Sequence, residues 1–193
     1  MKKTLFILLL ISTNLMYSQE IKTMIDPDDS TDLIFTDTNP VQIGYNVLTT
    51  SEFNNILIWE TTLGSIINSR GDQTIMNSLF GNPIAVDIDN FGDFIDYKYL
   101  GVNIYFSSMF NSAGEMEIAS FKIINTNASI TIKGINIKLG DNISKLGNIK
   151  FNLDKNGDYS ILFQACEGCD SFIVIDFDQD TKLITKIYLL DLT

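Results

Sequence analysis

The sequence predicts an α+β fold dominated by antiparallel sheet and built from two tandem units, each a short helix followed by a β-meander. Three observations support this prediction. Apolar and polar residues alternate with a period of two over eight segments, as in strands that bury one face. Residues typical of turns separate these segments. A Gly-Asp pair that can begin a short helix precedes each group of four strands, at Gly71-Asp72 and at Gly140-Asp141.

The N-terminus is expected to be a secretory signal peptide covering residues 1–18. Two lysines follow Met1, and the uncharged apolar run Leu5–Ile11 comes next, which is too short to span a bilayer. Ser18 is the best small residue for cleavage, which would leave Gln19 as the first residue. The alternative, a buried N-terminal strand, does not explain paired lysines beside this run. No cysteine lies near the cleavage site, so lipid anchoring is not expected.

An acidic extended segment over residues 19–43 is expected to follow, with Pro27 and Pro40 and one short strand at Leu33–Phe35. Removal of two lysines with the signal peptide takes the formal net charge from −11 to about −13. A chain of this charge repels nucleic acid and anionic lipid. No later run reaches the length of a membrane helix, so no membrane insertion is expected after cleavage.

The first α+β unit is expected over residues 44–127. It begins with a short helix capped at Thr50 or Ser51, with Glu52 in its first turn. The residues expected on the buried side of this helix, at a spacing of three to four, are Phe53, Ile56, Leu57 and Glu60. The helix that starts at Gly71-Asp72 leads into strands at Ile84–Ile88, Phe94–Leu100, Val102–Phe106 and Met116–Ile124.

The second unit is expected over residues 128–193, with Asn125–Gly134 separating the two groups of strands. Its strands are predicted at Lys150–Leu153, Tyr159–Gln164, Phe172–Phe177 and Leu183–Leu190. The pair Asn156-Gly157 indicates a type I′ hairpin. The side chains expected in a shared core are Ile104, Phe106, Phe121, Ile123, Phe163, Ile173, Ile175 and Ile187.

The residue inventory lowers the odds of several enzyme classes. There is no histidine, and Arg70 is the only arginine. Histidine performs most acid-base catalysis near neutral pH, and arginine performs most bidentate capture of phosphate. Hydrolase triads, histidine-ligated metals and phosphoryl transfer are therefore not expected, although carboxylates and lysines can also support catalysis.

Several motifs together resemble a known group of exported modules. These motifs are the Gly-Asp helix start, the turn Gly81-Asn82-Pro83 and the tyrosine-rich hairpin Tyr97–Phe106. Over Ile66–Leu192 the chain resembles the small α+β modules of the beta-lactamase inhibitor protein, of the SmpA/OmlA lipoproteins and of many exported proteins of the Bacteroidota phylum. The resemblance implies the fold and a role in protein–protein contact. It identifies no binding residue, and the chain lacks the lipobox cysteine of the lipoprotein branch.

Cys166 and Cys169 form the only cysteine pair. A disulfide at the tip of a hairpin is favoured, because exported proteins fold in an oxidising compartment. A redox pair would sit where a strand meets a helix, whereas here another strand is predicted to follow. A free dithiol is the remaining alternative. Zinc would need two further ligands, which the chain does not supply as cysteine or histidine.

Three clusters of acidic residues suggest a calcium site: Asp26/Asp28/Asp29, Asp154/Asn156/Asp158 and Asp176/Asp178/Asp180. The last two have the alternate oxygen ligands of an EF-hand loop. That loop needs glycine at its sixth position and glutamate at its twelfth. The chain has Tyr159 and Ala165, or Thr181 and Ile187, at those positions. Solvated turns are therefore the favoured interpretation, with a weak cation site of another type as the alternative.

Aromatic residues between Tyr97 and Phe110 suggest a binding face, since exposed aromatics are enriched at interfaces. Because strand side chains alternate, half of these aromatics must belong to the core. A paired-carboxylate site is also conceivable with 24 acidic residues, but no spacing selects two of them.

The sequence favours an exported, soluble, non-enzymatic protein-binding module, located in the periplasm or outside the cell. An inhibitor, an immunity-type protein or an envelope accessory protein fits this description, and the acidity suggests a basic protein partner. No cofactor, metal or nucleic acid is implied. The alternatives are a carboxylate-dependent envelope enzyme and a purely structural envelope protein. Carboxylates clustered in an apolar cleft would favour the enzyme, and an aromatic sheet face would favour binding.

Overall fold

The computed structural model describes residues 42–109 and 113–191. The predicted signal peptide, most of the acidic segment and the short strand at Leu33–Phe35 lie outside the described residues. Among the residues that the structure describes, none of the helices has the length and apolar character to cross a lipid bilayer.

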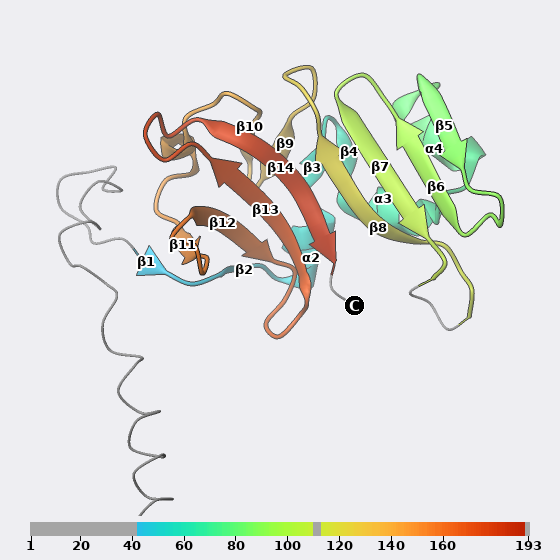
Figure 1. Ribbon diagram of the computed structural model, residues 1–193. Helices are drawn as coiled ribbons and strands as arrows, with labels where there is room; N and C mark the ends of the chain where they lie inside the picture. The colour runs from blue at the N-terminus through green and yellow to red at the C-terminus, as the bar shows by residue number, and fades with distance from the viewer. Residues whose placement is uncertain (1–41, 110–112, 192–193) are drawn as a thin grey trace, which may run out of the picture. The chain divides into compact units, whose positions relative to one another are not determined.

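A large, mostly antiparallel sheet confirms the predicted sheet-dominated α+β fold (Figure 1). Its first meander consists of β5 (Ala85–Ile88), β6 (Phe94–Lys98), β7 (Val102–Ser107) and β8 (Glu117–Ile123). Its second consists of β11 (Lys150–Leu153), β12 (Tyr159–Gln164), β13 (Ser171–Phe177) and β14 (Ile184–Asp191). All eight predicted strands are present, because alternation and turn residues are local signals.

The two meanders join at their last strands. β8 pairs antiparallel with β14 through Ile187↔Ile123 and Tyr188↔Lys122. The strand order across the sheet is therefore β11-β12-β13-β14-β8-β7-β6-β5. The helices lie on one face of this sheet (Figure 1). All eight predicted core side chains are buried, so β7, β8, β12, β13 and β14 turn toward the core the face that their alternation predicts.

Helix α2 (Thr50–Asn54) begins one residue before the first of its two predicted starts. Thr49 is the N-cap: its side chain accepts the Glu52 N–H, and the Glu52 carboxylate accepts the Thr49 N–H at 2.8 Å. This reciprocal pair is a capping box, which displaces the predicted caps Thr50 and Ser51 into the helix. Phe53 and Ile56 are buried as expected, whereas Leu57 is half-buried in a following strand. Glu60 is exposed, because the helix ends at Asn54 and Glu60 lies in the turn between β3 and β4.

The other helices correct one prediction and add one element. Helix α4 (Gln73–Phe80) starts with Asp72 as its cap, as predicted. Helix α3 (Leu63–Ser69), capped by Thr62, was not predicted. In the second unit the expected helix is a single 3-10 turn, η2 (Ile143–Leu146). Its cap is Asn142 rather than Asp141, because the Asp141 carboxylate instead accepts the Lys138 N–H and pairs with Lys145 at 2.9 Å.

A small sheet that was not predicted from the sequence links the two halves of the chain. Its strand order is β10 (Ile135–Ile137), β9 (Ile130–Ile132), β3 (Leu57–Ile58), β4 (Thr61–Thr62). The segment predicted only to separate the units thus contains β9. In addition, β1 (Gln42–Ile43) and β2 (Asn46–Val47) pair in parallel with β11 and β12. Strands from the start of the described chain therefore complete the second half of the large sheet.

The type I′ turn predicted at Asn156-Gly157 is wrong. Gly157 has a positive φ of 88°, but Asn156 does not, whereas a type I′ turn requires both. The Asp154 carboxylate closes the turn instead, by accepting the N–H groups of Asn156 and Asp158 at 2.7 and 2.9 Å. The type I′ geometry occurs between β9 and β10, where Lys133 and Gly134 have φ values of 50° and 80°.

Candidate binding surface

The large sheet has an outer face, turned away from the helices, whose chemistry changes halfway across. One row of directly paired residues crosses it from β6 to β12. In order, the row is Lys98, Asn103, Lys122, Tyr188, Val174, Leu162. The change from polar to apolar side chains falls at the seam between β8 and β14. Along this row, one half of the continuous sheet surface carries polar side chains and the other half carries apolar side chains.

The outer face of the first half carries polar and charged side chains together with one aromatic pair. Lys98 forms ion pairs with Asp87 at 2.5 Å and with Asp96 at 3.8 Å. Phe94 and Tyr105 stack there with ring centroids 5.7 Å apart. This composition is usual for a sheet face in contact with water.

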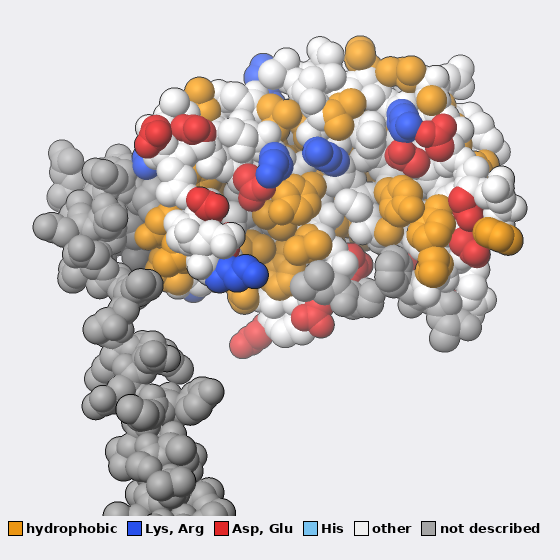
Figure 2. All heavy atoms as spheres, in the orientation of Figure 1, with side chains coloured by type: hydrophobic (Ala, Val, Ile, Leu, Met, Phe, Trp, Pro, Cys, Tyr) orange, Lys and Arg blue, Asp and Glu red, His pale blue; other side chains and the backbone are white. Residues whose placement is uncertain are grey.

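The outer face of the second half carries an apolar cluster, here called the apolar floor. Its members are Leu162, Phe172, Val174, Tyr188 and Leu190. Leu162 and Val174 are only 8% and 4% exposed, although they point away from the core, because their neighbours on this face cover them. Tyr45 packs on Phe172 at a centroid distance of 5.3 Å. Figure 2 shows apolar side chains gathered over these strands.

Two acidic turns border the apolar floor at one end. The β11–β12 turn and the β13–β14 turn lie at the same end of the sheet, and Gln179 donates to Asp158 at 3.5 Å between them. With the floor they line a groove of about 690 Å³, here called the acidic groove. Its charged lining residues are Asp154, Asp158, Asp176, Asp178, Asp180 and Lys186. The groove therefore combines an apolar base with an anionic end.

The carboxylates of the turns are held in their ionised form. The N–H and hydroxyl of Thr181 donate to Asp178, which lowers the pKa of that carboxyl. The N–H groups of Asp158 and Asn156 lower the pKa of Asp154 in the same way. Burial, and next the Asp176 carboxylate, raise the pKa of Tyr188, so this side chain stays a neutral phenol.

The acidic clusters do not form a cation cage in the described part of the chain. There, no three Asp, Glu, Cys or His side chains are placed to hold a metal ion together. Asp154 and Asp178 accept hydrogen bonds from their own turns, and Asp176 pairs with Lys186 at 3.3 Å. The cluster Asp26/Asp28/Asp29 lies outside the described residues.

The predicted aromatic face is divided between core and surface. Tyr97, Tyr99 and Phe106 are buried, Tyr105 lies on the outer face, and Phe110 lies outside the described residues. The larger apolar surface is on β12–β14, where the sequence analysis did not place it. The available signal was the uninterrupted apolar run that begins at Phe172, since a strand that is apolar at consecutive positions has both faces covered.

Cys166 and Cys169 form a disulfide in the turn between β12 and β13, with their Cα atoms 5.2 Å apart. The Cys169 N–H donates to the Cys166 carbonyl at 3.1 Å, and the Gln164 amide donates to the Cys169 carbonyl at 2.7 Å. The chain then continues as strand β13 rather than as a helix, so the helix N-terminus typical of redox pairs is missing at this position. The turn lies at the end of β12 and β13 opposite the acidic turns.

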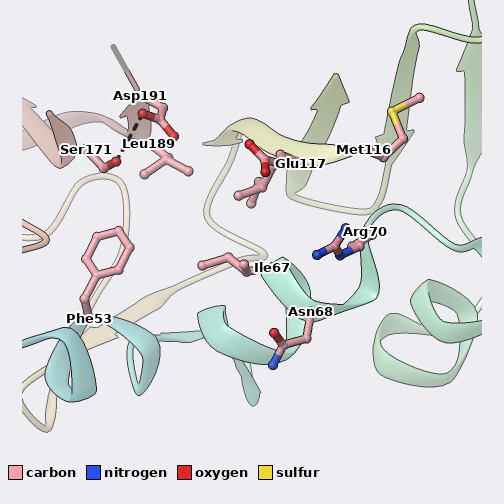
Figure 3. Close-up of a pocket in the computed structure, with 10 residues that line it drawn as sticks. Phe53, Ile67, Asn68, Arg70, Met116, Glu117, Ser171, Leu189 and Asp191 are labelled. Atoms are coloured by element: carbon pink, nitrogen blue, oxygen red, sulfur yellow. Dashed lines mark hydrogen bonds between the residues drawn. The ribbon is translucent and has the colours of Figure 1, made fainter. Parts of the chain in front are cut away.

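A smaller cleft of about 220 Å³ lies behind the sheet, between α2, α3 and the ends of β8 and β14 (Figure 3). Phe53, Ile67 and Leu189 line it, together with the carboxylates of Glu117 and Asp191. Asp191 accepts a hydrogen bond from the Ser171 hydroxyl at 3.1 Å. Arg70, the only arginine of the chain, forms an ion pair with Glu115 at the rim of the cleft. The cleft is small, and Asp191 and Arg70 are already paired with other residues of the same chain.

The fold and the groove define a sheet-dominated α+β protein with an apolar, acid-bordered surface on one half of its sheet. No protein-family model matches the chain, and no curated protein matches it. Among solved structures, a cysteine-rich secretory protein from Staphylococcus aureus is similar, with 15% sequence identity and a TM-score of 0.35. The match covers 62% of this chain and 43% of that one, so the chain corresponds to less than half of that protein.

Proposed function

We propose that this protein is an exported, non-enzymatic protein-binding module whose partner docks in the acidic groove. A single observation carries the proposal, namely the row that reads Lys98, Asn103 and Lys122 in the first half of the sheet and Tyr188, Val174 and Leu162 in the second. In this row the first half carries polar side chains where the second half carries apolar ones, so strand pairing by itself does not require apolar residues at these positions. Tyr188 and Leu190, the partly exposed members of the apolar floor, line the groove, and exposed aromatic or apolar side chains are typical of surfaces that bind another macromolecule.

The N-terminal residues support the exported location. Two lysines followed by an uncharged apolar run are typical of secretory signals, and a disulfide is typical of proteins that fold in an oxidising compartment. The resemblance to exported modules of the inhibitor type also favours protein–protein contact over catalysis. If the protein were instead an enzyme, its catalytic groups would be the carboxylates of the cleft behind the sheet. A purely structural protein would use neither this cleft nor the acidic groove.

Site-specific photo-crosslinking in the native host tests this proposal. A photoreactive amino acid replaces Ser160, which lines the groove, and in a second strain it replaces Ala85 on the outer face of β5. We expect one discrete adduct from position 160, with a partner that mass spectrometry identifies, and no such adduct from position 85. The intact mass of the uncrosslinked protein should lack about residues 1–18.

The variant Tyr188→Lys gives the second half the same side chain as Lys122, its partner across the seam. We expect it to abolish the adduct from position 160 without changing the circular dichroism spectrum. An adduct that persists in Tyr188→Lys, or no adduct from position 160, would contradict the proposed function. An unprocessed N-terminus would contradict the export.

A further inference from the structure

The acidic groove has two chemically different ends at a defined separation. The apolar floor includes Val174, and the anionic end includes Asp178, four residues further along the same chain segment. At a rise of about 3.3 Å per residue these positions are about 13 Å apart. A partner that fills the groove must therefore satisfy an apolar surface and an anionic one within that length.

The anionic end has more negative than positive charge available to a partner. Five aspartates line it against one lysine, Lys186, which already pairs with Asp176. Lys155 and Lys182 belong to the same turns but do not line the groove, and the Lys182 ammonium donates to the Gln179 carbonyl. Asp158 and Asp180 are exposed residues, so a cation on a docked partner can reach them.

The negative charge of the groove excludes several possible binding partners. A second copy of this chain has a net charge of −11, and the acidic segment of residues 19–41 has the same sign as the groove. Both would bring like charges together at the anionic end. Nucleic acid is excluded for the same reason. A cationic segment of another protein has the complementary charge.

We propose that the groove binds an extended, lysine- or arginine-bearing segment of a partner protein, with apolar side chains on the floor and basic side chains about four residues away between the two acidic turns. This inference rests on the proposed function and adds the chemistry of the partner. Binding in this way requires both ends of the groove. Its affinity should decrease as the salt concentration rises.

A labelled peptide of defined sequence tests the inference by fluorescence polarisation with the full mature protein. The probe is Gly-Leu-Thr-Val-Thr-Lys-Thr-Lys-Gly, which places its apolar and basic side chains on one face when extended. One comparison peptide carries glutamate for both lysines, and another carries threonine for leucine and valine. We expect each change to weaken binding at least about ten-fold, and binding of the probe to weaken between low and physiological salt.

Two double variants, each of which removes two negative charges, test where the lysines of the peptide bind. We expect Asp158→Asn with Asp180→Asn to weaken probe binding about five-fold, because exposed ion pairs contribute modestly. Glu167→Gln with Asp170→Asn removes two acidic groups at the opposite end of the same strands and should leave binding unchanged. Tyr188→Lys should abolish binding.

The inference is overturned if the lysine and glutamate peptides bind equally, if both pairs of substitutions act equally, or if the lysine peptide does not bind. If any of these results occurs while the unsubstituted protein still gives its adduct from position 160 and Tyr188→Lys abolishes that adduct, the inference falls and the proposed function stands. A dimer in sedimentation analysis that Tyr188→Lys dissociates would assign the groove to a second copy and would also overturn it.

Discussion

Gly101 is the residue at which the β6–β7 turn meets the connection that follows β8. Its φ is +111°, and a Cβ placed on it would lie 2.7 Å from the Ala128 backbone nitrogen and 3.0 Å from the Asn125 side-chain oxygen. Its carbonyl accepts the Ile124 N–H at 2.9 Å. Only glycine satisfies both the backbone conformation and this close approach.

We therefore expect Gly101→Ala to lower the free energy of unfolding by about 2 to 5 kcal/mol, through a strained backbone and a clash with a neighbouring chain segment. Gly157→Ala is the matched control, since Gly157 also has a positive φ but no atom near the added carbon. It should cost only about 1 kcal/mol. Urea denaturation measures both, and equal losses would contradict the role assigned to the close approach.

Single residues also mark the limit of sequence-based prediction in this protein. Asp72 was predicted as a helix cap and is one, but the parallel prediction for Asp141 is wrong. Both follow a glycine. The two residues differ in their hydrogen-bond donors, because the Asp141 carboxylate is engaged by the Lys138 N–H, which precedes the turn, and by the Lys145 ammonium within it. A capping residue is a local signal, whereas competition for its side chain depends on the whole local geometry.

At the scale of elements, the β13–β14 turn is closed by Asp178. Its carboxylate accepts the N–H groups of Asp180 and Thr181 and the hydroxyl of Thr181. These donors lower the pKa of Asp178 below its ordinary value of 3.8. A lowered pKa in the folded state means that the stabilisation is fully present above the unfolded value and is lost as the pH falls through the folded one.

We expect Asp178→Asn to lower Tm by about 2 to 4 °C at pH 7. The difference from the unsubstituted protein should shrink as the pH falls below about 4, because the native carboxylate then becomes protonated too. Asp180→Asn removes the same charge from the same turn, but the hydrogen bonds that close this turn go to Asp178. It is therefore the control for the loss of charge alone. Thermal melts at several pH values give the result, and a difference that is independent of pH would contradict it.

At the scale of the whole molecule, the seam between β8 and β14 makes the two meanders one sheet. Ile123 and Ile187 pair across it and are 1% and 0% exposed. The Ser120 hydroxyl also donates to the Leu189 carbonyl at 2.9 Å. The small sheet and the pairing of β2 with β12 connect the halves further. The two halves are therefore connected at three places, the β8–β14 seam, the small sheet and the β2–β12 pair.

We expect Ile187→Ala to lower the free energy of unfolding by about 2 to 5 kcal/mol, as for other buried isoleucines, and to leave a single cooperative transition. Leu183→Ala, at a site that is 39% exposed, should change it by less than about 0.5 kcal/mol. Hydrogen exchange should show amides of β6 and β12 losing protection together. Loss confined to the second meander would mean that the halves unfold independently.

The sequence by itself determined the eight strands of the two meanders, the helix that Asp72 caps, and the eight predicted core side chains. These features follow from period-two alternation and turn residues, which act between neighbours in the chain. Only the tertiary structure decided that β8 pairs with β14, that β9 joins β3, and that Leu162, Val174 and Tyr188 share one face with two acidic turns. Those outcomes depend on residues such as Lys122 and Tyr188 that are distant in sequence and adjacent only after folding. The candidate binding surface belongs to this second group, because an apolar side chain on an outer face has the same local pattern as one in the core.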